Sequence, residues 1–126
     1  MSIHGIGSDI VEIDRIKKVL KNKNFKKRIF SKDEIKTIDK KSNRIAFYAK
    51  RFAAKEAFSK AVGTGLSGGI SFQNISIIND EKGRPHIRLL GKTKTAVKQI
   101  IKKQYKTFLT ISDEKKYALA VVVITC

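Results

Sequence analysis

The stretch from Arg44 to Val62 constrains the fold of this chain more than any other, because it contains no helix breaker and is long enough for a central helix. Alanine and aromatic residues recur along it at three- and four-residue spacing, as in a helix with one buried face: Phe47, Ala49, Phe52, Ala53, Ala57, Phe58 and Ala61. Gly63 follows, at a position where helices commonly end in a left-handed glycine. We therefore expect a long helix that packs this face on a sheet.

Glu56 is the one carboxylate between Asp39 and Asp80, in an interval that is otherwise strongly basic. Lys60 follows it by four residues, so both side chains project from one side of the predicted helix. One interpretation is a surface ion pair, worth about 0.3–0.5 kcal/mol. The other is a metal-binding carboxylate beside a phosphate-binding lysine, because Mg²⁺ is usually held by one or two carboxylates together with substrate phosphates. The helix by itself leaves both interpretations open.

The N-terminal segment 3–13, IHGIGSDIVEI, contains a second candidate carboxylate. Its alternation predicts a strand with Ile3, Gly5 and Gly7 on one face and His4, Ile6, Ser8 and Ile10 on the other. Two glycines within a strand indicate a bulge or a close approach of another backbone. Asp9 is surrounded by apolar residues, where a carboxylate is costly unless it caps a turn or binds a cation. Both roles remain open for Asp9.

The remaining segments alternate between helical and strand patterns. Asp14 is predicted to cap the first of the shorter helices, and Ser31 with Glu34 forms a capping box. The expected helices cover residues 15–20, 25–30, 31–40 and 93–105. The expected strands form two hairpins, 72–79 with 85–90 and 108–112 with 117–125. This order predicts one α+β domain over residues 1–126, with a mostly antiparallel sheet packed against the long central helix.

Composition limits the classes of protein that this chain can belong to. The 126 residues have 41% hydrophobic content, which is typical of a folded domain, and no apolar run is long enough for a membrane span. The single cysteine, Cys126, forms no internal disulfide, which fits a reducing cytoplasm. The net charge of +17 predicts an anionic partner, which includes nucleic acid, a phosphorylated cofactor and an acidic protein.

Two long motifs resemble those of the holo-acyl-carrier-protein synthase family of 4′-phosphopantetheinyl transferases. They are GIGSDIVEIDRI, over Gly5–Ile16, and RFAAKEAFSKAVGTG, over Arg51–Gly65. Weaker agreement continues through Gly83–Pro85 and the terminal TISDEKKYALAVVV, so the resemblance covers essentially the whole chain. It implies an enzyme that moves the phosphopantetheine arm of coenzyme A to a serine of apo-acyl carrier protein, releases 3′,5′-ADP and serves fatty acid biosynthesis.

The resemblance also implies roles for particular residues. Asp9 and Glu56 would bind Mg²⁺, and Lys60 would contact the pyrophosphate and take part in catalysis with both carboxylates. The expected coenzyme A contacts are Arg51, Lys60, Gly63 and Gly65. Arg15 would contact the carrier protein. Family members of this short type are homotrimers with sites between subunits, so a homotrimer is expected here.

One position departs from the family pattern. Family members commonly have a histidine after the serine of the last hairpin motif, whereas here Ser112 is followed by Asp113. A negative charge there puts a coenzyme A contact in doubt, and we assign Asp113 no role in the site. The competing class is a basic nucleic-acid-binding protein, which the charge alone favours. The chain lacks the RNP and KH motifs, and paired carboxylates have no use in such a module, so the sequence favours the enzyme.

Overall fold

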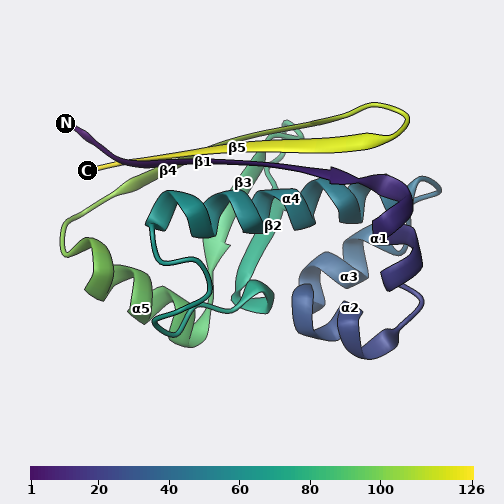
Figure 1. Ribbon diagram of the computed structural model, residues 1–126, viewed down its shortest axis with the longest axis horizontal. Coiled ribbons are helices and arrows are strands. Elements are labelled where there is room, and N and C mark those ends of the chain that lie inside the picture. Colours follow the sequence, from purple (N-terminus) through teal and green to yellow (C-terminus); the bar gives the residue numbers. More distant parts are fainter.

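The computed structural model describes all residues from Met1 to Cys126. Its main layer is a three-stranded antiparallel sheet in the order β1-β5-β4, formed by β1 (Ile3–Glu12), β5 (Tyr117–Thr125) and β4 (Lys106–Asp113). The long helix α4 (Arg44–Val62) runs along one face of this sheet (Figure 1). This arrangement confirms the expected α+β class, with antiparallel strands packed against a long central helix.

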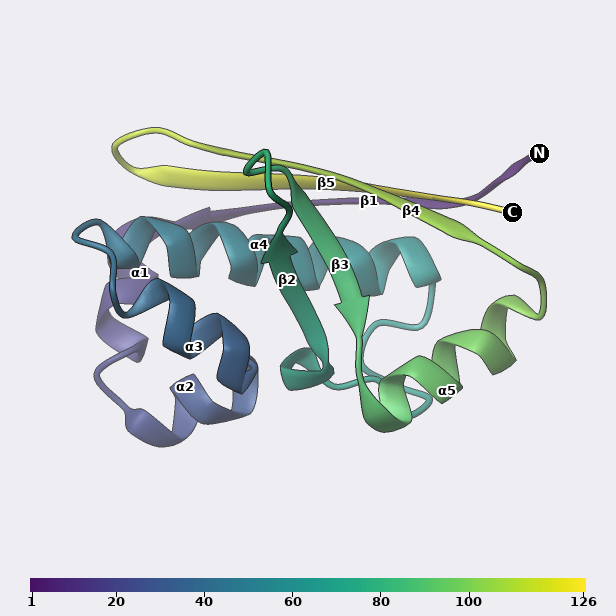
Figure 2. The same ribbon diagram turned by 180° about the vertical axis from the view of Figure 1, so that it is seen from behind.

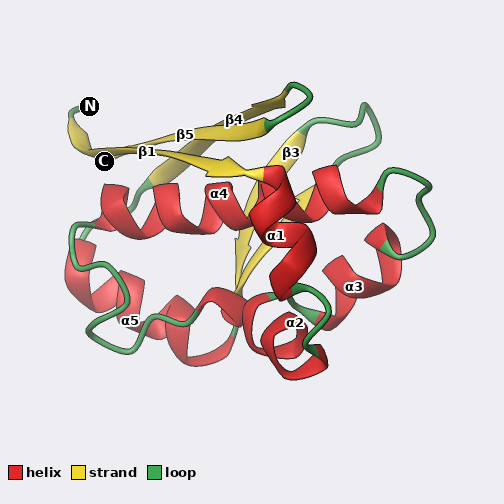
Figure 3. Ribbon diagram, turned by 45° about the vertical axis from the view of Figure 1, so that its right-hand side comes forward, coloured by secondary structure: helices red, strands yellow, loops and turns green.

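Shorter elements cover the side of α4 that faces away from this sheet. Near the start of α4 lie three helices, and α5 (Gly91–Ile101) lies near its end (Figure 2). The three are α1 (Ile13–Val19), α2 (Lys23–Ile29) and α3 (Lys32–Ile38). Between these groups runs a second antiparallel hairpin, made of β2 (Ile75–Asn79) and β3 (Pro85–Leu89) and entered through a 3-10 turn, η1 (Phe72–Asn74). The central helix is therefore enclosed between two layers (Figure 3).

Two glycines of β1 let the strand lie directly against α4. A β-carbon built on Gly5 would stand 1.9 Å from the carbonyl oxygen of Ala61, and one built on Gly7 would stand 1.8 Å from that of Ala57. The register of β1 against β5 also shifts between Ile3 and Gly5, which is a β-bulge. The two glycines thus mark both features that their presence in a strand predicts, a bulge and a close backbone approach.

Small side chains on both elements bring α4 and the sheet close together. Ala49, Ala53, Ala57 and Ala61 follow one another at four-residue spacing on α4, and all are 0–2% exposed. The facing side chains of β5 are equally buried, namely Ala118, Ala120, Val122 and Ile124, each 0% exposed. Because these side chains are small, α4 lies close to β1 and β5 along most of its length.

Several predicted boundaries are wrong. Asp14 is not an N-cap, since α1 already begins at Ile13. Asp14 lies in the first turn of α1, where a negative charge interacts favourably with the helix dipole. α5 ends at Ile101, short of the predicted end at 105, because Lys102 adopts φ 61°. Such a backbone angle is rare for a residue other than glycine and stops the α-helical path.

Other local predictions are confirmed. Ser31 and Glu34 form the reciprocal capping box of α3, and Gly63 ends α4 with φ 105°. Both predicted hairpins are present, although the first begins only at Ile75 because η1 precedes it. None of the helices combines the length and the apolar character that crossing a membrane requires.

Candidate active site

Asp9 and Glu56 come from different elements and line the same hollow. Strand alternation places Asp9 on the face of β1 that holds Gly7 and points to α4, and its side chain is 20% exposed. Glu56 projects from α4 on the side that faces β1 and α1. The hollow that both line has a volume of about 330 Å³. Residues 47 positions apart in the sequence are therefore brought together by the packing of β1 on α4.

The walls of this hollow differ in chemistry. Its third charged residue is the exposed Arg15, at the start of α1. The rest of the lining is apolar and comes from β1, α1, α2 and α4, namely Ile10, Val11, Ile16, Val19, Phe25 and Phe52. The carboxylates thus stand beside an apolar wall, and Arg15 stands at the side that α1 supplies.

Lys60 pairs with Asp9 and not with Glu56. Its Nζ donates to the carbonyl oxygen of Ser8 at 2.9 Å and lies 3.3 Å from Oδ1 of Asp9. Glu56 makes no ion pair of its own, so the interpretation of Glu56 and Lys60 as a helix-surface ion pair is wrong. Lys60 instead joins α4 to β1 beside the hollow. Its side chain is 51% exposed, so its ammonium is accessible to a ligand.

The pKa of the Glu56 carboxyl is raised above its ordinary value. Its partial burial raises the pKa of the carboxyl, the neighbouring charge of Asp9 raises it further, and Lys60 only partly offsets both. A divalent cation between the two carboxylates would relieve this repulsion. No group of three or more metal-binding side chains gathers anywhere in the chain. Two oxygen ligands fit Mg²⁺, which takes its remaining ligands from water and substrate phosphates.

Arg51 faces a different part of the molecule from Glu56. It is 3% exposed and lines a separate small hollow of about 140 Å³ between α3, α4 and β2. Its guanidinium donates to the carbonyl oxygen of Phe47 at 3.4 Å and to Oδ1 of Asn79 at 3.2 Å, and burial lowers its pKa. The structure does not bring Arg51 to the Asp9 hollow, so a contact with coenzyme A stays a prediction.

Gly63 and Gly65 form the turn that follows α4. Both have positive φ, 105° and 59°, and nothing lies near the position that a β-carbon would take. They are required there by backbone conformation, and the open space beside them leaves room for a ligand. Their assignment as coenzyme A contacts is untested. They follow Lys60 by about one helical turn, so a ligand on Lys60 could reach them.

Asp113, which replaces the histidine of the family pattern, ends β4 and pairs with a lysine of the central helix. Its Oδ1 lies 3.2 Å from Nζ of Lys50, whose ammonium also lies over the ring of Phe47 at 4.4 Å from the centroid. The negative charge is therefore balanced within this chain. The pair holds the end of β4 against the first half of α4.

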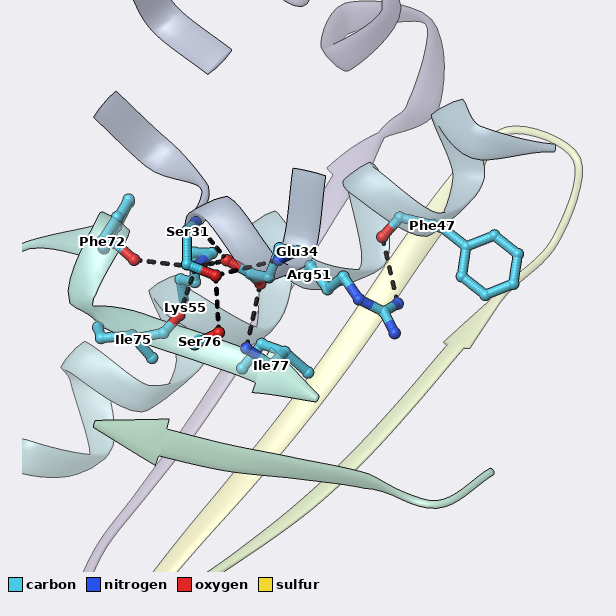
Figure 4. Close-up of polar contacts among 9 residues, drawn as sticks. All are labelled: Ser31, Glu34, Phe47, Arg51, Lys55, Phe72, Ile75, Ser76 and Ile77. Atoms are coloured by element: carbon cyan, nitrogen blue, oxygen red, sulfur yellow. Dashed lines mark hydrogen bonds and ion pairs between the residues drawn. The ribbon is translucent and has the colours of Figure 1, made fainter. Parts of the chain in front are cut away.

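A buried ion pair between Lys55 and Glu34 is the main polar feature that the sequence did not reveal (Figure 4). Both side chains are 0% exposed. The position of Lys55 in the alanine-rich segment of α4 was a signal, since a lysine in a largely buried helix must be either exposed or paired. The sequence could not identify its partner, because Glu34 was already explained by the capping box.

A larger hollow lies elsewhere and is not the candidate active site. It has a volume of about 800 Å³ and is lined by residues of α5, β4 and the two termini, including Lys98, Lys102, Lys103 and Lys106. It contains no acidic side chain that could bind a metal or act as a base. The smaller hollow at Asp9 is lined by two carboxylates and an apolar wall, and Lys60 donates to Asp9 beside it. This combination suits chemistry on a phosphorylated substrate.

Comparisons with known proteins identify the family of this enzyme. The sequence model of the 4′-phosphopantetheinyl transferase superfamily matches residues 5–122. The holo-[acyl-carrier-protein] synthase of Pelagibacter ubique is 51% identical over 98% of both chains, and that of Vibrio vulnificus is 43% identical over the same shares. The crystal structure of the Neisseria meningitidis holo-[acyl-carrier-protein] synthase superposes with a TM-score of 0.88 at 38% identity, covering 98% of this chain and 99% of that one.

The protein is thus a transferase of phosphopantetheinyl groups. It belongs to the 4′-phosphopantetheinyl transferase superfamily, and over nearly its whole length it is similar to the holo-[acyl-carrier-protein] synthases. This membership decides against the basic nucleic-acid-binding protein as the class of this chain. A related structure from Bacillus anthracis, 37% identical with a TM-score of 0.81 over 98% of this chain and 97% of that one, was solved in complex with coenzyme A (3′,5′-ADP).

Proposed function

We propose that this chain transfers the 4′-phosphopantetheine group of coenzyme A to a serine of apo-acyl carrier protein and releases 3′,5′-ADP, with Mg²⁺ as cofactor. The observation that carries the proposal is the meeting of Asp9 and Glu56 at one hollow, with Lys60 donating to Asp9 beside it. The relatives named holo-[acyl-carrier-protein] synthase and the coenzyme A complex of one of them support the substrates. We place the activity in fatty acid biosynthesis in the cytoplasm and treat residues 1–126 as one catalytic domain.

In this proposal the carboxylates of Asp9 and Glu56 hold Mg²⁺. When bound, the cation supplies positive charge at the pyrophosphate oxygens and lowers the barrier to attack at phosphorus. Lys60 is close enough to Asp9 to share the same ligand, and its ammonium stabilises the leaving 3′,5′-ADP as negative charge develops. The apolar wall that includes Phe25 and Phe52 keeps water from competing with the serine hydroxyl.

The reaction is tested by incubating the protein with apo-acyl carrier protein, coenzyme A and Mg²⁺ and measuring the intact mass of the carrier protein. We expect a gain equal to one phosphopantetheine group, and no gain when the metal is removed with a chelator. A variant of the carrier protein with alanine at the acceptor serine is the matched control. An unchanged carrier mass with wild-type components would refute the proposed activity.

Arg15 is proposed as a contact for the carrier protein. It is exposed, belongs to α1 and lines the hollow that Asp9 and Glu56 share, so a carrier docked there presents its serine next to the carboxylates. On the other flank of α1, Lys17 and Lys21 line a neighbouring hollow and extend the positive surface. Acyl carrier proteins are strongly acidic, so the two surfaces are complementary in charge.

We expect Arg15→Glu to raise the apparent KM for the carrier protein about tenfold, with little change in the KM for coenzyme A. The loss should shrink as salt rises from about 0.05 to about 0.5 M, because screening weakens the attraction of the wild-type surface first. Initial rates at varied carrier concentration provide the measurement. Lys94→Glu on α5 is the control, with the same change in charge on an exposed residue away from this hollow. If both variants raise the KM for the carrier protein equally, Arg15 contributes only nonspecific charge attraction and is not a docking contact.

We also propose that the chain assembles as a homotrimer through the outer face of the β1-β5-β4 sheet. Cross-strand partners place Ile6, Val123 and Phe108 in one row on this face, and Ile10 beside Leu119. Among them Ile6 is 61% exposed, Ile10 62% and Phe108 52%. Soluble monomers rarely leave so many large apolar side chains exposed together, so this face is a candidate interface between copies.

The assembly is tested by sedimentation equilibrium. We expect the wild-type chain to sediment with the mass of three chains. Phe108→Asp should shift the population to single chains, because it places a charge within the proposed interface. A wild-type chain that sediments as a monomer at concentrations of about 10–100 μM would refute the proposed trimer.

A further inference from the structure

The buried pair of Lys55 and Glu34 joins α4 to three other elements (Figure 4). Nζ of Lys55 donates to Oε1 of Glu34 at 2.7 Å, to the carbonyl oxygen of Phe72 at 2.9 Å and to that of Ile75. Glu34 in turn accepts from the backbone N–H groups of Ser31 at 2.8 Å and Ile77 at 3.1 Å. The network therefore connects α4 with α3, η1 and β2.

Stability alone is a weak reason for this pair. Desolvation of two charges in the interior offsets most of their attraction, and apolar side chains of similar size often serve at least as well. Here both side chains are 0% exposed, so each charge bears the full cost of desolvation. All the buried polar side-chain atoms are hydrogen-bonded, so the network is complete and holds one geometry.

The contacts on the two sides of α4 explain how the Lys55 network can fix the rotation of this helix. Towards β1 and β5 the helix presents alanines, which allow a close approach to the sheet but carry no polar group that specifies the rotation of the helix about its axis. Lys55 immediately precedes Glu56, and successive residues of a helix are turned by about 100°. Anchoring the ammonium of Lys55 on the α3 and β2 side therefore sets the direction in which Glu56 points on the β1 side.

We propose that the Glu34–Lys55 pair is a positioning device that fixes the rotation of α4, so that Glu56 faces Asp9 across the hollow. The inference rests on the proposed function, since it concerns the same two carboxylates. Lys55 and Glu34 touch neither of them and act through the backbone of α4. The pair determines the spacing of the two carboxylates and hence the affinity of the site for a divalent cation.

The test is the double variant Glu34→Leu/Lys55→Met, which replaces the pair by apolar side chains of similar size. We expect each single variant to lower Tm strongly, because each leaves one buried charge without its partner. The double variant should recover part of that loss, since the backbone groups that Glu34 and Lys55 bind still lose their partners. In the recovered double variant we expect kcat to fall about 10–100-fold while the KM for coenzyme A changes less than about threefold. We expect Mn²⁺ affinity, measured by electron paramagnetic resonance on the protein alone, to fall by a similar factor as kcat.

Lys26→Met/Asp39→Asn is the matched control. It removes another lysine–carboxylate pair, one with an N–O distance of 2.8 Å whose residues do not line the hollow, and it keeps an oxygen for the hydroxyl of Tyr48. We expect normal kcat and Mn²⁺ affinity in this control. A stable Glu34→Leu/Lys55→Met variant with wild-type kcat and Mn²⁺ affinity would reduce the pair to an ordinary stabilising contact and overturn the proposal.

Glu34→Gln decides the question if the double variant does not fold. It keeps the size of the side chain and one oxygen that can accept from the backbone N–H of Ser31. It removes the charge that holds Lys55 and the second oxygen, which accepts from Ile77. Weakened Mn²⁺ binding in the folded Glu34→Gln protein supports the proposal, and unchanged binding overturns it. Because Mn²⁺ binding needs no carrier protein or coenzyme A, this result is independent of whether the wild-type chain carries out the proposed transfer.

Discussion

Glu56→Gln is expected to lower the turnover of carrier protein by about 10²–10⁴-fold, which corresponds to a loss of about 3–5 kcal/mol of transition-state stabilisation. The substitution keeps the size of the side chain and removes the charge that would hold Mg²⁺ beside Asp9. Steady-state rates at saturating coenzyme A, read by the mass of the carrier protein, provide the measurement. Asp9→Asn is expected to have the same effect, since the two carboxylates line one hollow. Near-normal turnover in either variant would remove both residues from the proposed metal site.

Thermal unfolding without metal separates this role from a structural one. The pKa of Glu56 is raised in the folded protein above its ordinary value of 4.5, so its ionised form opposes folding at neutral pH. Glu56→Gln should therefore raise Tm slightly at pH 7, and the gain should disappear below about pH 4.5, where the carboxyl is protonated in both folded and unfolded states. Added Mg²⁺ should raise the Tm of the wild-type chain and have little effect on the variant.

Gly7→Ala is expected to prevent folding of the chain. The new β-carbon would stand 1.8 Å from the carbonyl oxygen of Ala57 and 2.8 Å from the backbone nitrogen of Ala61. Both are backbone atoms of a rigid helix, so no side chain can rotate away, and α4 must separate from β1. We expect a destabilisation of more than about 4 kcal/mol, which is at the upper end for single substitutions.

Circular dichroism and the yield of soluble protein measure this effect. Ser8→Ala is the control, because Ser8 is the next residue of β1 and its exposed side chain faces away from α4. Its Tm should stay within a few degrees of the wild-type value. A Gly7→Ala protein with wild-type Tm would show that β1 and α4 do not touch as closely as the structure has them.

Local patterns in the sequence predicted most of the elements, because each depends on interactions within a few residues. The apolar spacing over 44–62 and the glycine after it define α4, and Ser31 with Glu34 defines the start of α3. The predictions that failed concern helix ends, where competing local preferences are nearly equal in energy. Asp14 is as favourable within the first turn of α1 as at its cap, and Lys102 stops α5 by a backbone angle that its side chain does not reveal.

The sequence by itself determined which residues are candidates for the site, since Asp9 lies among apolar residues and Glu56 is the one carboxylate in a basic interval. It also contained the reason that they meet, in the two glycines of β1, although the partner of those glycines could not be read from it. Only the tertiary structure decided that Lys60 pairs with Asp9, and that Lys55 is buried on Glu34 while Arg51 faces another hollow. Helical spacing gives the direction of a side chain relative to its own helix. The partner of that side chain depends on which other element packs against this side of the helix. The packing of elements is decided by the burial of apolar surface over the whole chain.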